Sequence, residues 1–251
     1  LRFHAVIWPA MLMAAGLEVP KKVFAHGWLL VGGEKMSKSK LTGIAPSDIT
    51  DHFGVDAFRY YFLRAIPFGS DGSFSWEDMS ARYTSELAND FGNLASRLAA
   101  MIEKYCGGKI PAVAKDATLA QSLQETVEKA DKAMVALDFQ GGINAVMDYC
   151  KQVNGFVTIK EPWILAKDPA NQAVLEEVLY NTAESLRALA VLLHPVMPAT
   201  TEILWESLGA KASLGEIGKQ EISKVATWGQ LPQGATVTKT PVLFPRLEVK
   251  E

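Results

Sequence analysis

The chain has little cysteine and no paired cysteine motif. Its 251 residues hold two cysteines, Cys106 and Cys150, which lie far apart and form no CxxC pair. A disulfide scaffold and a cysteine-based zinc site are therefore not predicted. Two free thiols in a reducing, cytoplasmic compartment are the simplest interpretation. No Ser/His/Asp triad, zinc-ligand cluster or paired acid/base dyad is recognisable either, so no metal site is predicted.

Long apolar runs are also missing. A membrane helix requires about 18–20 consecutive apolar residues, and the longest candidate, around residues 186–197, is interrupted by His194 and Pro195. No membrane partner is expected. A signal peptide is not visible, and the chain opens with Leu1 rather than Met, so we interpret it as a fragment or as one chain of a cleaved protein.

A strong excess of one charge is absent as well. The chain has 25 Lys and Arg against 28 Asp and Glu, a net charge of −3. This balance argues against a general nucleic-acid coat protein but leaves room for a local basic site. The length and the 49% hydrophobic content suit a globular protein with one large domain or two ordinary ones.

The most informative stretch that is present is 33–40, Gly-Glu-Lys-Met-Ser-Lys-Ser-Lys. Three lysines among two serines predict an exposed loop rather than a core strand or a helix. Lys35, Lys38 and Lys40 could converge on one anion, with hydroxyl and backbone N–H groups adding hydrogen bonds, and polyphosphate is the natural candidate. The alternative is an ordinary solvated basic turn.

The segments before this loop predict part of an α/β sheet. Residues 3–15 are apolar nearly all round and predict a short buried helix, which Pro9 would kink or restart. Residues 23–31 are rich in β-branched and aromatic side chains and predict a buried strand of a parallel sheet, ended by Gly32. The lysine loop then follows the carboxyl end of a strand, where ligands bind in open α/β sheets.

The segments after the loop predict helices. A short helix over 48–53, capped by Ser47 and ended by Gly54, precedes a second helix over 55–65. From Trp76 to Tyr105 apolar residues recur every three or four positions, which predicts one long amphipathic helix. Further helices are expected at 117–136, 140–158, 171–193 and 197–208, forming a bundle of about five members.

The lysine stretch also contains a family signature. Lys35-Met36-Ser37-Lys38-Ser39 is identical to the KMSKS motif of class I aminoacyl-tRNA synthetases. Four further segments occur in the expected order: FHAVIWP at 3–9, FAHGW at 24–28, NLASR at 93–97 and EPW at 161–163. Over nearly its whole length the chain resembles the C-terminal half of methionyl-tRNA synthetases. The HIGH motif of that family, which belongs to the N-terminal half, is not in this sequence.

The resemblance implies a fold class and a domain division. Residues 1–33 would be the α/β end of a Rossmann-type catalytic nucleotide-binding fold, and residues 34–75 the KMSKS loop with a connector that contacts the tRNA stem. Residues 76–220 would form an α-helical anticodon-binding bundle, and residues 221–251 a tail that folds back. Asp56, Arg59, Tyr60 and Tyr61 could touch the stem or brace the lysine loop, although helix packing explains the tyrosines equally well.

The activity that the resemblance implies is ATP-dependent ligation of methionine to tRNA through methionyl-adenylate, with ATP and Mg²⁺. Lys38, and then Lys35, would bind the departing phosphates as catalytic residues. The implied ATP-binding residues are His26, Gly27, Trp28, Leu29, Lys35, Met36, Ser37, Lys38 and Ser39. A glycine such as Gly27 permits close approach of a flat adenine ring, but it can equally mark a bulge or tight packing.

The resemblance also places methionine and tRNA. Phe3, His4 and Trp8 would line the methionine pocket, where an apolar aromatic wall suits a thioether. Core packing would also explain them. Ile7 stands where many relatives have an aromatic residue, which softens one wall.

The implied readers of a CAU anticodon are Asn93, Arg97 and Trp163. Asn93 and Arg97 lie four residues apart on one helix face, and both suit base edges. Trp163 follows Pro162 at a helix break, where its ring could stack on a base. A solvated helix face and a core tryptophan are the alternatives.

Two rivals remain from the sequence. Another class I synthetase would activate a different amino acid. A non-catalytic tRNA-binding module would use this chain alone. As an enzyme, the chain would need the N-terminal half as a partner and would be inactive by itself.

Overall fold

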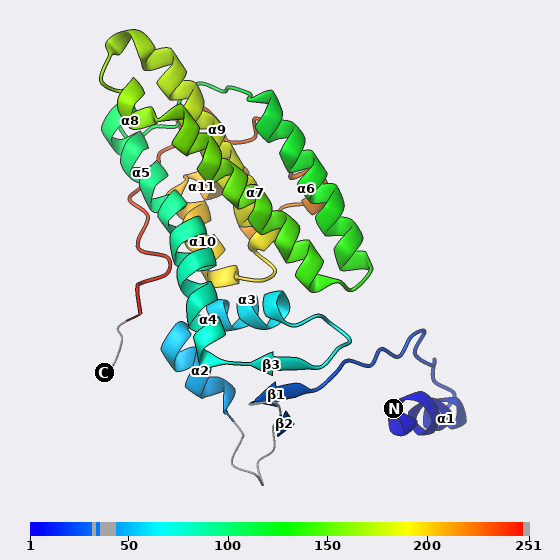
Figure 1. Ribbon diagram of the computed structural model, residues 1–251. Helices are drawn as coiled ribbons and strands as arrows, with labels where there is room; N and C mark the ends of the chain where they lie inside the picture. The colour runs from blue at the N-terminus through cyan, green and yellow to red at the C-terminus, as the bar shows by residue number, and fades with distance from the viewer. Residues whose placement is uncertain (32–33, 36–43, 248–251) are drawn as a thin grey trace.

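The computed structural model describes residues 1–31, 34–35 and 44–247. Long helices form a bundle at one end of the molecule, and a small sheet with short helices lies at the other (Figure 1). The lysine stretch falls largely outside the described residues: only the backbone of Glu34–Lys35 belongs to an element, and residues 36–43 are not described.

The sheet has three short strands in the order β2-β1-β3. Strand β1 (Leu29–Val31) is parallel to β3 (Gly72–Phe74), with Leu30 opposite Ser73, and antiparallel to β2 (Glu34–Lys35). The predicted parallel pairing is therefore present. The predicted length is wrong, because residues 23–28 run as an extended segment and only 29–31 pair as a strand. Neither is this strand fully buried, since its three residues are half-buried.

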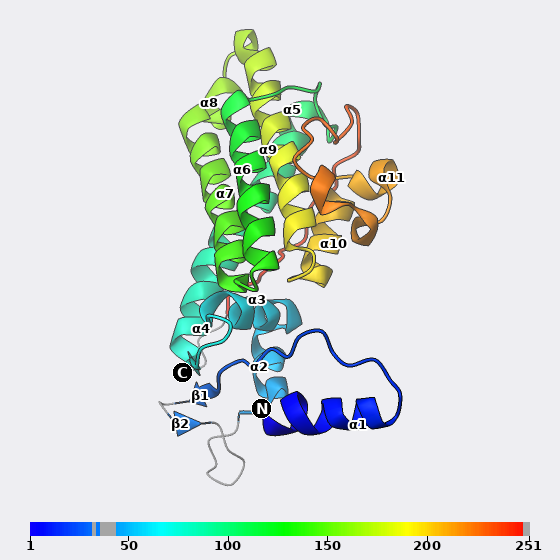
Figure 2. The same ribbon diagram turned by 90° about the vertical axis from the view of Figure 1, so that its right-hand side faces the viewer.

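The first helix departs from its predicted burial. A π-helical segment (Phe3–Ile7) continues into α1 (Trp8–Ala14), with the change of helix type next to Pro9. No residue of either segment is buried, and both stand apart from the bundle (Figures 1 and 2). An apolar helix is buried only where another element packs on it, and the described bundle helices lie away from this one.

Two short helices connect the sheet to the bundle. Helix α2 (Pro46–Phe53) and α3 (Val55–Ala65) are separated by Gly54, which has φ 84°. The predicted cap by Ser47 is wrong. Pro46 already occupies the first helical turn, and Asp48 reaches back so that its carboxylate accepts the Ala45 N–H at 2.9 Å.

Charged side chains of α3 form hydrogen bonds with backbone groups of the bundle at residues 195–200. Arg59 donates to the carbonyls of Pro195 and Val196 at 2.7 and 2.9 Å. Asp56 accepts the Thr200 N–H at 2.6 Å. Tyr60 is buried and donates to Glu86, and burial together with that carboxylate raises the pKa of Tyr60 well above its ordinary value. The packing alternative fits the two tyrosines, which are buried; contact of exposed Arg59 with a tRNA stem or the lysine loop stays a prediction.

The long helix predicted from Trp76 to Tyr105 is present, in three parts. Helix α4 (Trp76–Arg82) passes into a π-helical segment (Tyr83–Gly92) and then into α5 (Asn93–Cys106), which ends at left-handed Gly107. The apolar stripe explains the π segment. Three successive steps of four residues would turn an α-helical stripe by about 40° each, whereas the wider helix keeps these residues together in the core: Met79, Tyr83, Leu87 and Phe91.

The remaining helices surround a central one. Their bounds are α6 (Ala117–Val135), α7 (Phe139–Lys160), α8 (Pro162–Leu165), α9 (Gln172–Leu193), α10 (Pro198–Ser207) and α11 (Ala210–Leu214). Single 3₁₀ turns occur at Pro169–Asn171, Ile217–Lys219 and Ile222–Lys224. The four predicted bundle helices after the long one are thus confirmed to within a few residues.

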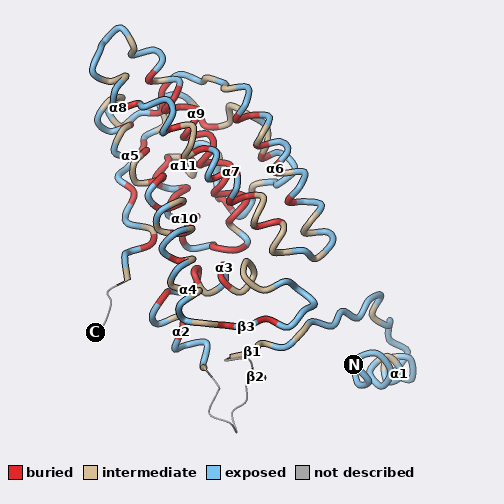
Figure 3. The backbone as a smooth tube through the Cα atoms, viewed as in Figure 1, coloured by how far each residue is buried: buried red, intermediate tan, exposed pale blue. Residues whose placement is uncertain are grey.

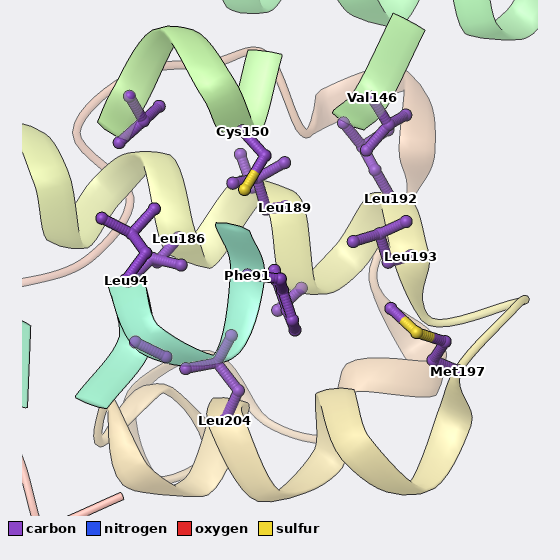
Figure 4. Close-up of a cluster of buried hydrophobic side chains, with 14 of the residues drawn as sticks. Phe91, Leu94, Val146, Cys150, Leu186, Leu189, Leu192, Leu193, Met197 and Leu204 are labelled. Carbon is purple, nitrogen blue, oxygen red and sulfur yellow. The ribbon is translucent and has the colours of Figure 1, made fainter. Parts of the chain in front are cut away.

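Helix α9 is the centre of the bundle. Every residue from Val178 to Leu193 is buried, and most of them are apolar. It contacts α5, α6, α7, α8 and α10, and it forms the continuous buried stretch of Figure 3. Figure 4 shows Leu186, Leu189 and Leu193 of α9 among side chains of the long helix, α7 and α10.

A buried carboxylate attaches the tail to this central helix. Glu184 accepts the guanidinium of Arg187 at 2.9 Å and the backbone N–H groups of Gly229, Gln230 and Leu231 at 2.9–3.1 Å. Arg187 in turn donates to the Val225 carbonyl at 2.8 Å. Both side chains are essentially inaccessible to water, and every interaction of a buried charge of this kind must be satisfied internally.

Candidate functional site

The candidate residues fall at opposite ends of the molecule. Figures 1 and 2 place α8 at the far end of the bundle, away from the sheet that precedes the lysine stretch. The predicted anticodon residues lie at the first end, and the predicted nucleotide and methionine residues lie at or beyond the second.

The structure brings Arg97 and Trp163 together from different elements. The Arg97 guanidinium carbon of α5 lies 5.6 Å from the centroid of the Trp163 ring on α8. This is a cation–π arrangement, which also keeps a planar donor group beside a planar ring. Trp163 is 38% exposed and Arg97 is half-buried, so the pair remains accessible to a ligand.

Asn93 lies on the same helix face as Arg97, one turn earlier. Its side chain is exposed, while Leu94 and Leu98 between and after the two polar residues are fully buried. The predicted division of α5 into an apolar inner face and a polar outer face is therefore present. Outward donor and acceptor groups beside an open aromatic ring make a surface suited to unstacked bases.

The sharp turn before Trp163 depends on Glu161. This residue ends α7 and begins α8 in the left-handed conformation, with φ 44°, which is uncommon for a residue other than glycine. The left-handed turn at Glu161 was not predicted from the sequence. The available signal was the Glu161-Pro162 junction, because a residue before proline is driven away from the α-helical region and therefore ends a helix.

Positive charge flanks the same tryptophan. Lys160 and Lys167 are both exposed, three residues before and four residues after it, and the Lys160 ammonium lies 5.7 Å from the centroid of the Phe156 ring. Exposed lysines around a stacking platform suit a phosphate backbone, which binds through charge without sequence preference.

At the sheet end, the predicted adenosine residues share one small cavity. His26, Gly27, Trp28 and Leu29 line a space of about 180 Å³ together with residues of α3, of the 66–70 turn and Phe139. Apolar side chains form most of its wall. Phe68 stacks on Phe24 at 4.9 Å between ring centroids and meets Phe139 edge-on at 4.9 Å.

The backbone of the 70–71 turn accounts for Gly27. A Cβ on Gly27 would lie 2.2 Å from the Ser70 carbonyl and 2.4 Å from the Asp71 nitrogen, so no other residue fits there. The neighbouring Trp28 N–H donates to the Asp71 carboxylate at 2.6 Å, and the Trp28 carbonyl accepts from Gly72. Tight packing therefore requires glycine at this position, and the role of Gly27 in adenine binding stays a prediction.

The predicted methionine residues lie on one exposed helix face. Phe3, His4 and Trp8 line an open depression of about 460 Å³ with Ile7 and Met11. Phe3 is 71% exposed and Trp8 is 45% exposed. The core-packing alternative for these residues therefore does not hold within this structure, and the three side chains do share a surface.

The predicted phosphate-binding residues are placed only in part. Lys35 contributes its backbone to β2, and Met36, Ser37, Lys38 and Ser39 lie outside the described residues. Among the residues that the structure describes, no three His, Cys, Asp or Glu side chains gather as metal ligands would. Within the same residues, no helix combines the length and the apolar character needed to cross a bilayer.

Two family models match the chain. The model for class I tRNA synthetases (M) matches residues 1–99, and the model for the anticodon-binding domain of tRNA ligases matches residues 116–233. The predicted fold class, the end of a class I catalytic fold followed by a helical anticodon-binding bundle, is thereby confirmed.

Individual relatives match over the whole chain. The methionine–tRNA ligase of Streptomyces coelicolor is 62% identical over 100% of this chain and 48% of its own length, and that of Bacillus subtilis is 43% identical over 100% and 38%. The structure of Mycobacterium tuberculosis methionyl-tRNA synthetase in complex with methionyl-adenylate superposes with a TM-score of 0.84 at 35% identity, covering 98% of this chain and 48% of that one. The chain thus spans about half the length of these relatives, and it belongs to the methionine–tRNA ligase family of class I tRNA synthetases.

Proposed function

We propose that this chain is the C-terminal half of a methionine–tRNA ligase, which joins methionine to a tRNA with a CAU anticodon through methionyl-adenylate. The observation that carries the proposal is identity of 62% over the entire chain with a methionine–tRNA ligase, across both matched domains. The full reaction belongs to the longer protein, because the chain covers only about half of such relatives.

The anticodon end of the proposal rests on the surface of Asn93, Arg97 and Trp163. One base of the loop stacks on the Trp163 ring, and Arg97 and Asn93 offer donors and an acceptor to base edges. Support comes from the 5.6 Å approach of Arg97, which is half-buried, to that ring and from the exposure of Asn93 and Trp163. The flanking Lys160 and Lys167 bind phosphates without reading sequence.

The catalytic end rests on the KMSKS sequence at 35–39 and on its position after β1. The methionine carboxylate attacks the α-phosphorus of ATP and pyrophosphate leaves; the ribose hydroxyl of the tRNA 3′ end then attacks the methionyl carbonyl, and AMP leaves. No covalent enzyme intermediate is needed, so charge stabilisation and positioning supply the catalysis. Lys38, with Lys35, binds the departing phosphates, and Mg²⁺ enters with the triphosphate as part of the substrate. Of the adenosine residues, His26 to Leu29 contribute mainly backbone.

The N-terminal segment takes part in methionine binding and in contact with the other half of the enzyme. Phe3, His4 and Trp8 form the pocket wall. Their exposure on a free-standing helix supports the idea that a further protein segment covers this face, since large apolar side chains cost free energy in water. We therefore expect the chain alone to be inactive in aminoacylation, and the complete enzyme to act in the cytoplasm with tRNA.

The first experiment measures binding of this chain to an RNA hairpin with a CAU anticodon loop and to a hairpin with one base changed, at fixed salt. We expect the changed base to weaken binding by about 1–3 kcal/mol. Equal affinity for the two hairpins would contradict anticodon recognition by this bundle. Salt is held constant because phosphate contacts alone change affinity steeply with ionic strength.

A second experiment separates an enzyme from a non-catalytic tRNA-binding module. In the full-length protein, methionine-dependent exchange of pyrophosphate into ATP is expected, and Lys38→Ala should lower its rate by about 10²–10³-fold, as for the loss of one preorganised donor. A loss confined to methionine affinity, with the rate unchanged, would contradict the role of Lys38. Exchange with another amino acid instead would indicate a different class I synthetase.

A further inference from the structure

We infer that Asn154 is a positioning residue for anticodon discrimination. It acts by holding the point where the long helix changes from π to α geometry, immediately before Asn93, and thereby sets the direction in which Asn93 and Arg97 project. The inference rests on the proposed function, because it concerns how that surface is kept in register.

The change of helix type determines the rotation of α5. In the π segment each N–H bonds to the carbonyl five residues earlier, as in the bond from Asn93 to Ala88. In α5 the bond spans four residues. The change in span skips one carbonyl acceptor and amounts to one extra residue, which turns all that follows by about 100° about the helix axis. Asn93 and Arg97 face outward only in the shifted register.

Two side chains of α7 donate to the backbone carbonyl of Asp90, in the last turn of the π segment. Asn154 of α7 donates its amide to the Asp90 carbonyl at 2.8 Å, and the Cys150 thiol points to the same oxygen at 3.6 Å. Asn154 also bonds to the Cys150 carbonyl of its own helix at 3.1 Å, which fixes its rotamer. Asp90 lies in the last turn of the π segment, and a donor from another helix on its part-buried carbonyl stabilises the π-to-α change at this point rather than one turn away.

Asn154 also ties the two halves of the surface to each other. It lies on α7, which ends at Lys160, and Trp163 follows nine residues after Asn154, beyond Glu161 and Pro162. Its partner Asp90 lies three residues before Asn93 and seven before Arg97. One hydrogen bond therefore joins the π segment that continues into the helix of Arg97 to α7, which precedes the short helix of Trp163. The adjacent core contains Phe91, Leu94 and Cys150 in one cluster (Figure 4). Apolar contacts have no fixed direction, so they set the helix register less strictly than a hydrogen bond does.

The test compares hairpin binding by the wild-type chain and by Asn154→Ala, at one salt concentration. We expect the preference for the CAU loop over the one-base variant to fall about tenfold, while affinity for the variant loop, which reports phosphate contacts, stays within twofold. Asn154→Gln, which keeps an amide donor, should restore at least half of the preference. Thr158→Ala is the matched control on the same helix, because its hydroxyl bonds only to the Asn154 carbonyl; it should leave the preference unchanged.

The outcomes are distinguishable. An unchanged preference in Asn154→Ala, or equal losses for both hairpins, would overturn the positioning role, since the second result is what general loosening of the bundle produces. A wild-type chain without any preference would instead contradict the proposed anticodon recognition. If circular dichroism shows that Asn154→Ala does not fold, Asn154→Ser, whose hydroxyl is too short to reach Asp90, is judged by the same criteria.

Discussion

At the scale of single residues, two side-chain pairs that each contain an arginine differ in their access to water. Arg97 and Trp163 form an accessible pair at the end of the bundle, whereas Arg187 and Glu184 form a pair without access to water. The first arrangement leaves donors and a ring face for a ligand. The second saturates its donors and acceptors with the protein's own backbone, and it serves stability alone.

Replacement of Trp163 with alanine tests the accessible pair. The CAU hairpin should bind about 1–3 kcal/mol more weakly, because one base loses its stacking partner, and the thermal midpoint should change little for a ring that is 38% exposed. Ile164→Ala, at a neighbouring position that is 43% exposed, removes apolar surface but no ring and should bind normally. Equal losses from both variants would show that the ring has no specific role.

Replacement of Glu184 with glutamine tests the buried pair. The change removes the charge that compensates Arg187 and weakens three backbone hydrogen bonds to the tail. We expect the free energy of unfolding in urea to fall by about 3–5 kcal/mol. Glu177→Gln, at an exposed position near the start of the same helix, should cost no more than about 0.5 kcal/mol. A Glu184→Gln loss of that same small size would contradict the structural role.

At the scale of elements, α10 depends on the connector for its first turn. The residue before it, Met197, has no side-chain acceptor for the free N–H groups. The carboxylate of Asp56 on α3, distant in sequence, accepts the Thr200 N–H instead. The connector and the bundle therefore share one helix cap, which links α3 to the start of α10.

Asp56→Ala should therefore destabilise the protein by about 1–2 kcal/mol, the cost typical of losing a helix cap with a favourable charge. Equilibrium unfolding measured by circular dichroism gives this value. Asp51→Ala, at an exposed site on α2, is the control and should change stability by less than about 0.5 kcal/mol. If the two variants were equally stable, the contact from α3 to α10 would contribute nothing.

At the scale of the whole molecule, one buried thiol makes the stability of the fold depend on pH. Cys150 is fully buried, and burial, with Asp90 nearby, raises the pKa of its thiol from 9.0 to about 12. A raised folded-state pKa means that the unfolded chain loses its proton first. This contribution to stability is complete below about pH 9 and is lost as the pH rises toward 12.

Unfolding in urea at about pH 9.5 and about pH 11 measures this effect. The wild-type free energy of unfolding should fall between these values by roughly 2 kcal/mol more than that of Cys150→Ser, at about 1.4 kcal/mol per pH unit for one proton. Serine does not ionise in this range, and the tyrosines and lysines contribute equally to both proteins. Parallel pH dependences for the two proteins would mean that the thiol ionises as easily in the folded state.

The sequence by itself determined the local and chemical features. Apolar spacing located the long helix and the four bundle helices, because burial of one face leaves a period that survives in the residue order. The KMSKS string and four further segments identified the family before any contact was known. Asn93, Arg97 and Trp163 were named from the same segments, although their role awaits the binding experiment.

Only the tertiary structure decided which side of each element meets which partner. The apolar residues of 3–15 predicted burial, yet burial needs a neighbour, and no described helix covers them. The close packing of Gly27 became visible only with the 70–71 backbone against it. The partners of Asp56 and Asn154 left no pattern in the sequence, because each side chain bonds to a backbone group more than sixty positions away. Such pairings arise from packing between elements, and residue order alone does not encode the distance between them.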